Sequence, residues 1–191
     1  ISEGKCEEIA SEAKKLFSLR SIMSYLSQYE IKSQFAMKTY QKFGENAKEL
    51  VQSNPYILCG DSIELDFKKA DIIACDERIE KNSHKRIIAG AQYVLKANTT
   101  LGHSCLPLST LLDKTSTALN VSESDFYSAY NEALEEDELF EYVKNQREYV
   151  YLPDYYYAEQ YISDRIKVLR EFSSPEDFDF NAMIDIEDCL L

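Results

Sequence analysis

The sequence predicts a mainly α protein with one short β-hairpin in its last third. Apolar residues recur at helical spacing along most of the 191 residues. Two β-like runs, at 139–143 and 149–152, flank the turn-like segment 144–147. Apolar residues make up 45% of the chain and charged residues 29%, which is a globular composition.

Short helices joined by tight turns are expected in the first hundred residues. Gly44 is a helix stop signal, and Asn54 precedes Pro55, a position that disfavours helical dihedral angles. Ser2 is the expected cap of the first helix. The expected helices span residues 2–16, 19–29, 33–43, 47–52, 67–74 and 83–98.

The second part of the chain predicts two further helices, at 108–119 and 122–134, before the β-hairpin. Ser122 and Asp125 resemble a capping box with Asp in place of Glu. Three helices followed by a hairpin is the order of elements in a winged helix. A last helix is expected from Pro153 to Phe172, with an apolar face of Ala158, Tyr161, Ile162, Ile166 and Leu169. The apolar tail 176–191 is expected to pack on something and to end inside a larger fold.

Charge is divided unevenly along the chain. Residues 1–100 hold 15 Lys and Arg against 14 Asp and Glu, whereas residues 101–191 hold 6 against 20. A strongly acidic surface repels nucleic acid and anionic lipid. We therefore expect any nucleic-acid contact in the first half.

No motif for catalysis or nucleotide binding is found in the sequence. It contains no G-x-x-x-x-G-K-[ST], no G-x-S-x-G and no H-E-x-x-H. His103 and Cys105 could share a metal, but we favour a surface His and a buried Cys. The acidic run 135–138 is interpreted as a solvated helix end. We expect no catalytic residue, metal or cofactor in this chain.

Membrane and export signals are also missing. No apolar run reaches the roughly 18 residues of a membrane span, and no apolar segment follows the first residues. The five cysteines form no C-x-x-C pair, which favours reduced thiols. These observations predict a cytoplasmic protein with no membrane partner. The absence of Met at position 1 suggests a piece of a longer chain.

Two segments share one plan, a turn followed by a helix with an early Ala. They are 29–40, which contains Glu30-Ile31-Lys32, and 63–73, which contains Glu64-Leu65-Asp66. Each resembles the helix-hairpin-helix motif, whose usual form is hydrophobic-Gly-hydrophobic-Gly before a helix. In that motif the glycines let backbone N–H groups approach a DNA phosphate.

The whole chain resembles the region N-terminal to the motor in RecD-like ATP-dependent DNA helicases. That family carries tandem helix-hairpin-helix motifs and then a winged-helix-like segment. The matching stretches are 36–44, 54–56, 67–71, 86–95, 102–107 and 150–159. The resemblance implies a helix-hairpin-helix bundle over 1–78, a winged-helix-like subdomain over 79–153, and a helix and tail over 154–191 that lead into the motor.

The resemblance also implies a function. We expect a DNA-binding accessory region of a 5′-to-3′ helicase in recombination and repair, which contacts single-stranded or forked DNA without reading sequence. ATP and Mg²⁺ would belong to the full-length ATP hydrolase. The expected phosphate contacts are Lys32, Lys38, Lys42, Lys68 and Lys69.

The hairpins depart from the family pattern, which leaves a second hypothesis open. Glu and Asp replace glycines, so negative charge stands where a phosphate would lie. The first hairpin is the better site because Lys32 and Lys38 flank it. The expected recognition helix, 122–134, has acidic residues and no Lys or Arg. The alternative is an interaction or scaffolding module that docks on the motor or on a protein partner. Its surface could include Tyr149, Tyr151, Tyr155, Tyr156 and Tyr157, although we favour packing of these rings between the hairpin and the next helix. Base stacking by them is less favoured because their neighbours are acidic.

Overall fold

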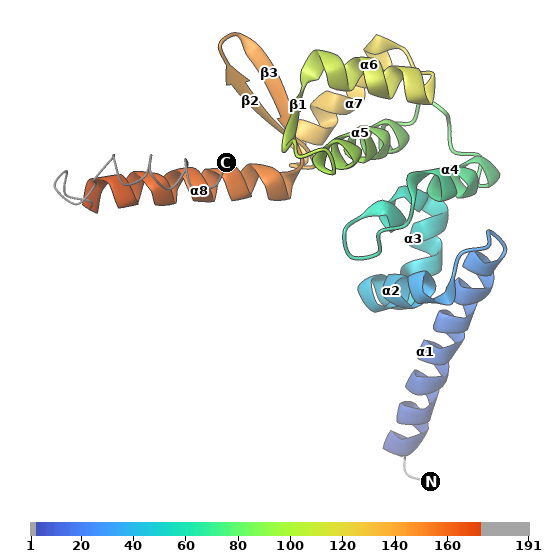
Figure 1. Ribbon diagram of the computed structural model, residues 1–191. Helices are drawn as coiled ribbons and strands as arrows, with labels where there is room; N and C mark the ends of the chain where they lie inside the picture. The colour runs from blue at the N-terminus through green and yellow to red at the C-terminus, as the bar shows by residue number, and fades with distance from the viewer. Residues whose placement is uncertain (1–2, 173–191) are drawn as a thin grey trace, which may run out of the picture.

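The computed structural model describes residues 3–172, which form a mainly α fold with one small sheet (Figure 1). The first part holds four α-helices and two short 3₁₀ helices. They are α1 (Glu3–Ser27), α2 (Ser33–Phe43), η1 (Gly44–Asn46), α3 (Ala47–Ser53), η2 (Pro55–Cys59) and α4 (Phe67–Asp76). The second part holds α5 (His84–Thr99), β1 (Cys105–Pro107), α6 (Leu108–Leu119), α7 (Glu123–Glu135), β2 (Phe140–Lys144), β3 (Arg147–Tyr151) and α8 (Pro153–Phe172).

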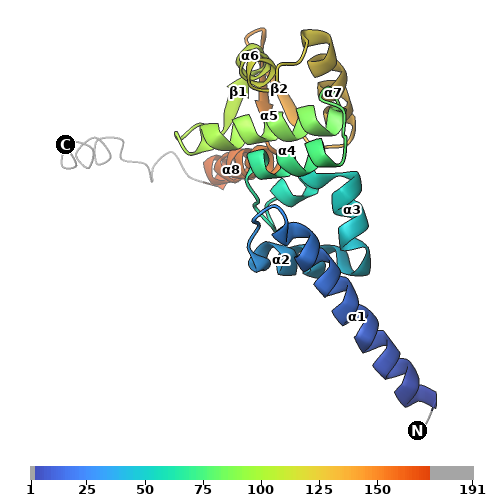
Figure 2. The same ribbon diagram turned by 90° about the vertical axis from the view of Figure 1, so that its right-hand side faces the viewer.

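Helix α1 corrects the first prediction. Two helices were expected between residues 2 and 29, but α1 runs unbroken from Glu3 to Ser27. Between Gly4 and Gly44 the sequence has no Gly or Pro, so no residue interrupts the backbone hydrogen bonds. The N-terminal half of α1 projects away from the other helices (Figure 2). Ser2, the expected cap, lies outside the described residues.

Several predicted boundaries are confirmed because local signals set them. Helices α2, α6 and α8 begin and end where the sequence predicts. Gly44 ends α2 with a φ of 61°, a conformation that glycine adopts without steric cost. The hydroxyl of Ser122 accepts a hydrogen bond from the backbone N–H of Asp125 and so caps α7.

The sheet contains one strand that the sequence analysis missed. Strands β2 and β3 form the expected hairpin, with a two-residue turn at Asn145 and Gln146, both of positive φ. Strand β1 adds to the other edge of β3, which gives the antiparallel order β1-β3-β2. The three residues of β1 were expected only as a break between helices, because their strand conformation depends on pairing 40 residues away in sequence.

One continuous hydrophobic core joins the two parts of the chain. It runs from Ile22 of α1 to Val150 of β3 and includes buried residues from every α-helix between them. Phe67 of α4 contacts Tyr56 of η2 and Tyr93 of α5, with ring centroids 5.6 and 5.7 Å apart. The part that precedes residue 79 is therefore packed directly on the part that follows.

Helix α8 differs from its predicted environment. Its apolar side chains were expected to form a packed face, yet Tyr161 is 64% exposed and Ile162 and Ile166 are more than half exposed. Its first turn is held by the sheet, where Tyr156 stacks on Phe140 at a centroid distance of 4.7 Å. Beyond that turn α8 extends away from the sheet (Figure 1). The tail 176–191 lies outside the described residues.

The run of tyrosines beside the hairpin is divided between packing and exposure. Tyr151 and Tyr156 pack between β3 and α8, with ring centroids 5.9 Å apart. Tyr155 and Tyr157 are exposed. No helix among the residues 3–172 combines the length and the apolar character needed to cross a bilayer.

Candidate nucleic-acid interface

The two predicted hairpins have nearly the same backbone. Glu30 and Glu64 stand at the positions of the first glycine, and both take positive φ, of 55° and 60°. The next residues, Ile31 and Leu65, are each only 5% exposed and belong to the core. Each hairpin thus keeps the turn of the motif although a glutamate replaces the glycine. That backbone conformation costs a residue with a Cβ roughly 1–2 kcal/mol.

The two helices that follow the hairpins also begin alike. Lys32 precedes α2 with φ and ψ of −61° and 146°, and Asp66 precedes α4 with −60° and 135°. Both are therefore N-cap residues with extended backbone. The first N–H groups of a helix have no partner within the helix, and together with the helix dipole they attract an anion.

The side chains at these two caps have opposite effects. The carboxylate of Asp66 accepts a hydrogen bond from the backbone N–H of Lys68 at 2.9 Å, so α4 carries its own anion at its N-terminus. Lys32 makes no side-chain cap hydrogen bond, and it places a cation beside the first turn of α2. Only the first hairpin therefore combines the turn of the motif with an uncapped, positively charged helix start.

The structure brings one distant lysine to this place. The Nζ atom of Lys69, on α4, donates a hydrogen bond to the backbone carbonyl of Glu30 at 3.2 Å. Lys69 and Lys32 are thus the two predicted lysines that lie at the first hairpin. Both side chains are exposed to solvent.

The other three predicted lysines are exposed but lie elsewhere. Lys38 and Lys42 are four residues apart on α2, and the Nζ of Lys42 lies 5.4 Å from the ring centroid of Phe43. Lys68 lies on α4 at the edge of a pocket between α4, α5 and α6. Two of the five predicted lysines, Lys32 and Lys69, therefore lie at the first hairpin. The other three lie elsewhere on α2 and α4.

Sequence reasoning missed Lys96, which offsets part of the negative charge of the second hairpin. Its Nζ lies 2.9 Å from a carboxylate oxygen of Asp61 and 4.0 Å from one of Glu64. The hydrogen bond with Asp61 raises the pKa of Lys96 above its usual value. Lys96 is 32 or more residues away in sequence on α5, so no local pattern could have identified it.

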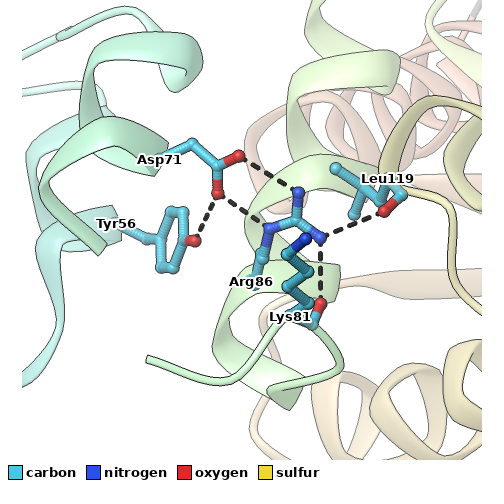
Figure 3. Close-up of polar contacts among 5 residues, drawn as sticks. All are labelled: Tyr56, Asp71, Lys81, Arg86 and Leu119. Atoms are coloured by element: carbon cyan, nitrogen blue, oxygen red, sulfur yellow. Dashed lines mark hydrogen bonds and ion pairs between the residues drawn. The ribbon is translucent and has the colours of Figure 1, made fainter. Parts of the chain in front are cut away.

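A polar cluster fixes α4 against α5 next to this region (Figure 3). The guanidinium of Arg86 donates to both oxygens of Asp71, at 2.8 and 3.1 Å, and also to the backbone carbonyls of Lys81 and Leu119. The Tyr56 hydroxyl donates to Asp71 at 2.7 Å. Burial would raise the pKa of Asp71, but these hydrogen bonds outweigh it and hold the pKa below its usual value.

The second part of the chain presents a different surface. The first turn of α7, the expected recognition helix, carries Glu123 and Asp125. At its other end Glu132 contacts His84 of α5. Glu135, Glu136 and Asp137 after it are exposed. This surface has the acidic character expected from the sequence and offers no cation on α7 for a phosphate.

Nothing in the described part of the chain resembles a metal centre. Between residues 3 and 172 there is no group of three or more His, Cys, Asp or Glu side chains arranged to hold a metal ion. Burial raises the pKa of the Cys59 thiol to about 12, so this thiol is inert at neutral pH. The polar groups at the first hairpin are backbone N–H groups and ammonium groups, a combination that can bind an anion.

A comparison of the sequence with known protein families agrees with this description. Residues 15–105 match the helix-hairpin-helix domain of ATP-dependent RecD2 DNA helicases. The matched stretch contains both hairpins, the Asp71–Arg86 cluster and Lys96, and it ends in β1. The resemblance to the N-terminal region of RecD-like helicases is thus confirmed, over the residues in which the two hairpins lie.

Proposed function

We propose that this chain is a DNA-binding accessory region of a RecD-like ATP-dependent 5′-to-3′ DNA helicase that acts in recombination and repair. It would hold the backbone of single-stranded or forked DNA without reading its sequence. The observation that carries the proposal is the start of α2. There the turn at Glu30 leads into a helix N-terminus that has a lysine, and no side-chain cap, at its N-cap.

A phosphate at this position would meet three favourable groups. The N–H groups of the first turn of α2 would donate to its oxygens, as they do at other helix N-termini that bind anions. Lys32 at the cap and Lys69, held at the carbonyl of Glu30, would add positive charge. Such contacts fix the position of a strand and give salt-dependent affinity, but they carry no sequence information.

The second hairpin would contribute little to this affinity. The carboxylate of Asp66 already occupies the N-terminus of α4, and Lys96 is engaged by Asp61 and Glu64. We therefore assign phosphate contact mainly to Lys32 and Lys69. Lys38, Lys42 and Lys68 would act as weaker, more distant cations.

The remaining parts of the chain would serve the motor. We propose the divisions 1–78, 79–153 and 154–191, with a winged-helix-like subdomain supported by the order α5-β1-α6-α7-β2-β3. The acidic surface of this subdomain would contact a protein surface, such as the basic surface around the DNA channel of a motor domain. ATP and Mg²⁺ would be bound by that motor domain, outside this chain.

Fluorescence anisotropy with labelled single-stranded, duplex and forked DNA, titrated across salt, tests the proposal. We expect micromolar or tighter binding that weakens as salt rises. The Lys32→Glu variant should bind DNA roughly tenfold more weakly. The slope of the logarithm of its binding constant against the logarithm of salt concentration should fall in magnitude by about one. The matched control is Lys144→Glu, at an exposed end of β2. It makes the same charge change in the second part of the chain, away from the turns at Glu30 and Glu64.

Two results would contradict the proposal. An equal loss in the Lys32→Glu and Lys144→Glu variants would show that only net charge matters and that the first hairpin is not the site. Absence of binding at about 20 mM salt, where electrostatic contacts are strongest, would exclude independent DNA binding. The interaction or scaffolding hypothesis would then account better for this chain.

A further inference from the structure

A pocket of about 430 Å³ lies between α4, α5 and α6. Pockets that hold small ligands occupy about 300–1,000 Å³ and are mostly apolar with a few polar groups. This one has the same character. Its apolar lining includes Ile72, Tyr93, Val94 and Leu119, and Lys68 and Asp76 are charged residues of the lining.

Two large side chains of the lining are exposed although they are apolar in character. Ile72 is 59% exposed and Tyr93 is 41% exposed. The ring of Phe67, which also belongs to the lining, lies next to Tyr93 at a centroid distance of 5.7 Å. An exposed aromatic ring in a pocket is a surface on which another flat ring can stack.

The pocket is adjacent to the first hairpin. The Tyr29 hydroxyl, next to Glu30 in sequence, donates a hydrogen bond to Asp76 at 3.1 Å, and Asp76 belongs to the pocket lining. On the same helix, Lys68 belongs to the lining while its neighbour Lys69 contacts Glu30. A nucleic-acid strand whose backbone lies on the first hairpin therefore passes beside the pocket.

We propose that this pocket holds one unpaired nucleobase of the DNA strand whose backbone lies on the first hairpin. The base stacks on Tyr93 and lies against the apolar wall of the pocket, and Lys68 lies near the adjoining phosphate. The proposal rests on the proposed function, since the strand must first be held at Lys32 and Lys69. It adds a preference for unpaired DNA, because a base within a duplex cannot enter the pocket.

The polar groups of the pocket favour a base over a charged ligand. Asp71 is paired with Arg86, and Asp76 accepts the hydrogen bond of Tyr29, so both carboxylates of the lining are engaged. What is left is an apolar wall, an aromatic ring and one ammonium group. Stacking on an aromatic ring tolerates any base, so the pocket would not select one sequence.

Two strands that differ only in their bases test this inference. One is an oligothymidylate and the other an abasic strand of the same length and charge, both followed by fluorescence anisotropy. We expect Tyr93→Leu to weaken the oligothymidylate on the order of tenfold and to leave the abasic strand unchanged. Tyr93→Phe keeps the ring and should bind both strands as the unaltered chain does.

A second measurement requires no substitution. The exposed thiol of Cys75 also lies in the lining, so its alkylation, read by peptide mass spectrometry, should slow with oligothymidylate only.

The outcomes separate this inference from the proposed function. Equal binding of the two strands, or equal losses for both in Tyr93→Leu, overturns the base pocket while leaving the phosphate site intact. The apolar lining would then fit a protein side chain better. Failure of both strands to bind overturns the proposed function, and the base pocket with it.

Discussion

The two hairpins of this chain share a backbone but differ in what their helix N-termini can bind. Both turns use a glutamate of positive φ, and both bury the following residue, Ile31 or Leu65. At the next position Lys32 leaves α2 uncapped, whereas Asp66 caps α4 with its own carboxylate. The backbone of a motif can therefore be kept while one residue decides whether an external anion is bound.

The comparison also explains why acidic residues are tolerated at the second hairpin. Asp61 and Glu64 are both paired within the chain with the single ammonium group of Lys96 on α5, which offsets part of their charge. At the first hairpin the only described contact of a neighbouring lysine is that of Lys69 with a backbone carbonyl, which leaves its charge available. The lysine at the second hairpin is thus paired with carboxylates, whereas the lysine at the first hairpin contacts only a neutral carbonyl.

The largest expected effect tests the shared part of the two hairpins. Ile31→Ala and Leu65→Ala should each lower the free energy of unfolding by about 2–5 kcal/mol, because each removes a buried side chain from the same core. Urea denaturation followed by circular dichroism measures both. A large loss at one position and almost none at the other would show that the hairpins are not equivalent in packing.

The next effect tests the residue that separates the hairpins. Lys32→Asp should give α2 the cap that α4 has, which should raise the free energy of unfolding by about 1 kcal/mol. The same change should lower DNA affinity about tenfold, since it places a carboxylate where the phosphate would lie. Denaturation and anisotropy on the same sample therefore move in opposite directions.

Asp66→Asn is the matched change at the second hairpin. Asparagine caps a helix about as well as aspartate, so stability should stay within a few tenths of a kcal/mol. DNA affinity should rise, by less than it falls in Lys32→Asp, because Glu64 and Asp61 remain nearby. If DNA affinity is unchanged in both Lys32→Asp and Asp66→Asn, the N-cap residues do not determine DNA binding.

A smaller effect is expected from restoring glycine to the turns. Glu30→Gly and Glu64→Gly should each raise the free energy of unfolding by about 1 kcal/mol, since glycine adopts positive φ without the penalty of a Cβ. Thermal denaturation measures the change. If either variant is destabilised, the side chain of that glutamate supports its hairpin through contacts that outweigh the backbone penalty.

The smallest effect concerns the ion pair between Lys96 and Asp61 at the second hairpin. A double-mutant cycle between Lys96→Ala and Asp61→Ala should give a coupling of about 0.2–1 kcal/mol, because both side chains are largely exposed. The coupling should shrink as salt is added. A coupling that is larger and insensitive to salt would identify this pair as a structural element rather than a surface contact.

Local signals account for most of the fold that could be predicted. Gly44, Ser122 and Pro153 set helix ends that the structure confirms. Three predictions were wrong or incomplete. Helix α1 is unbroken where two helices were expected, strand β1 exists because it pairs with β3, and most of the expected apolar face of α8 is exposed rather than packed.

The site was predicted less completely than the fold. Lys32 and Lys69 are on the expected list, and the structure places both at the first hairpin. The positive φ of Glu30 and Glu64 could not be inferred from the residues themselves, because glutamate rarely adopts it. The role of Lys96 depends on how α5 lies across the second hairpin, which is a property of tertiary packing.

The core that runs from Ile22 to Val150 has a thermodynamic consequence for the whole chain. With the Asp71–Arg86 cluster across the same junction, neither part can expose its buried surface without the other. The described residues should therefore melt in a single cooperative transition, with equal calorimetric and van't Hoff enthalpies. Heat that unfolds the acidic second part should therefore unfold the first hairpin at the same temperature.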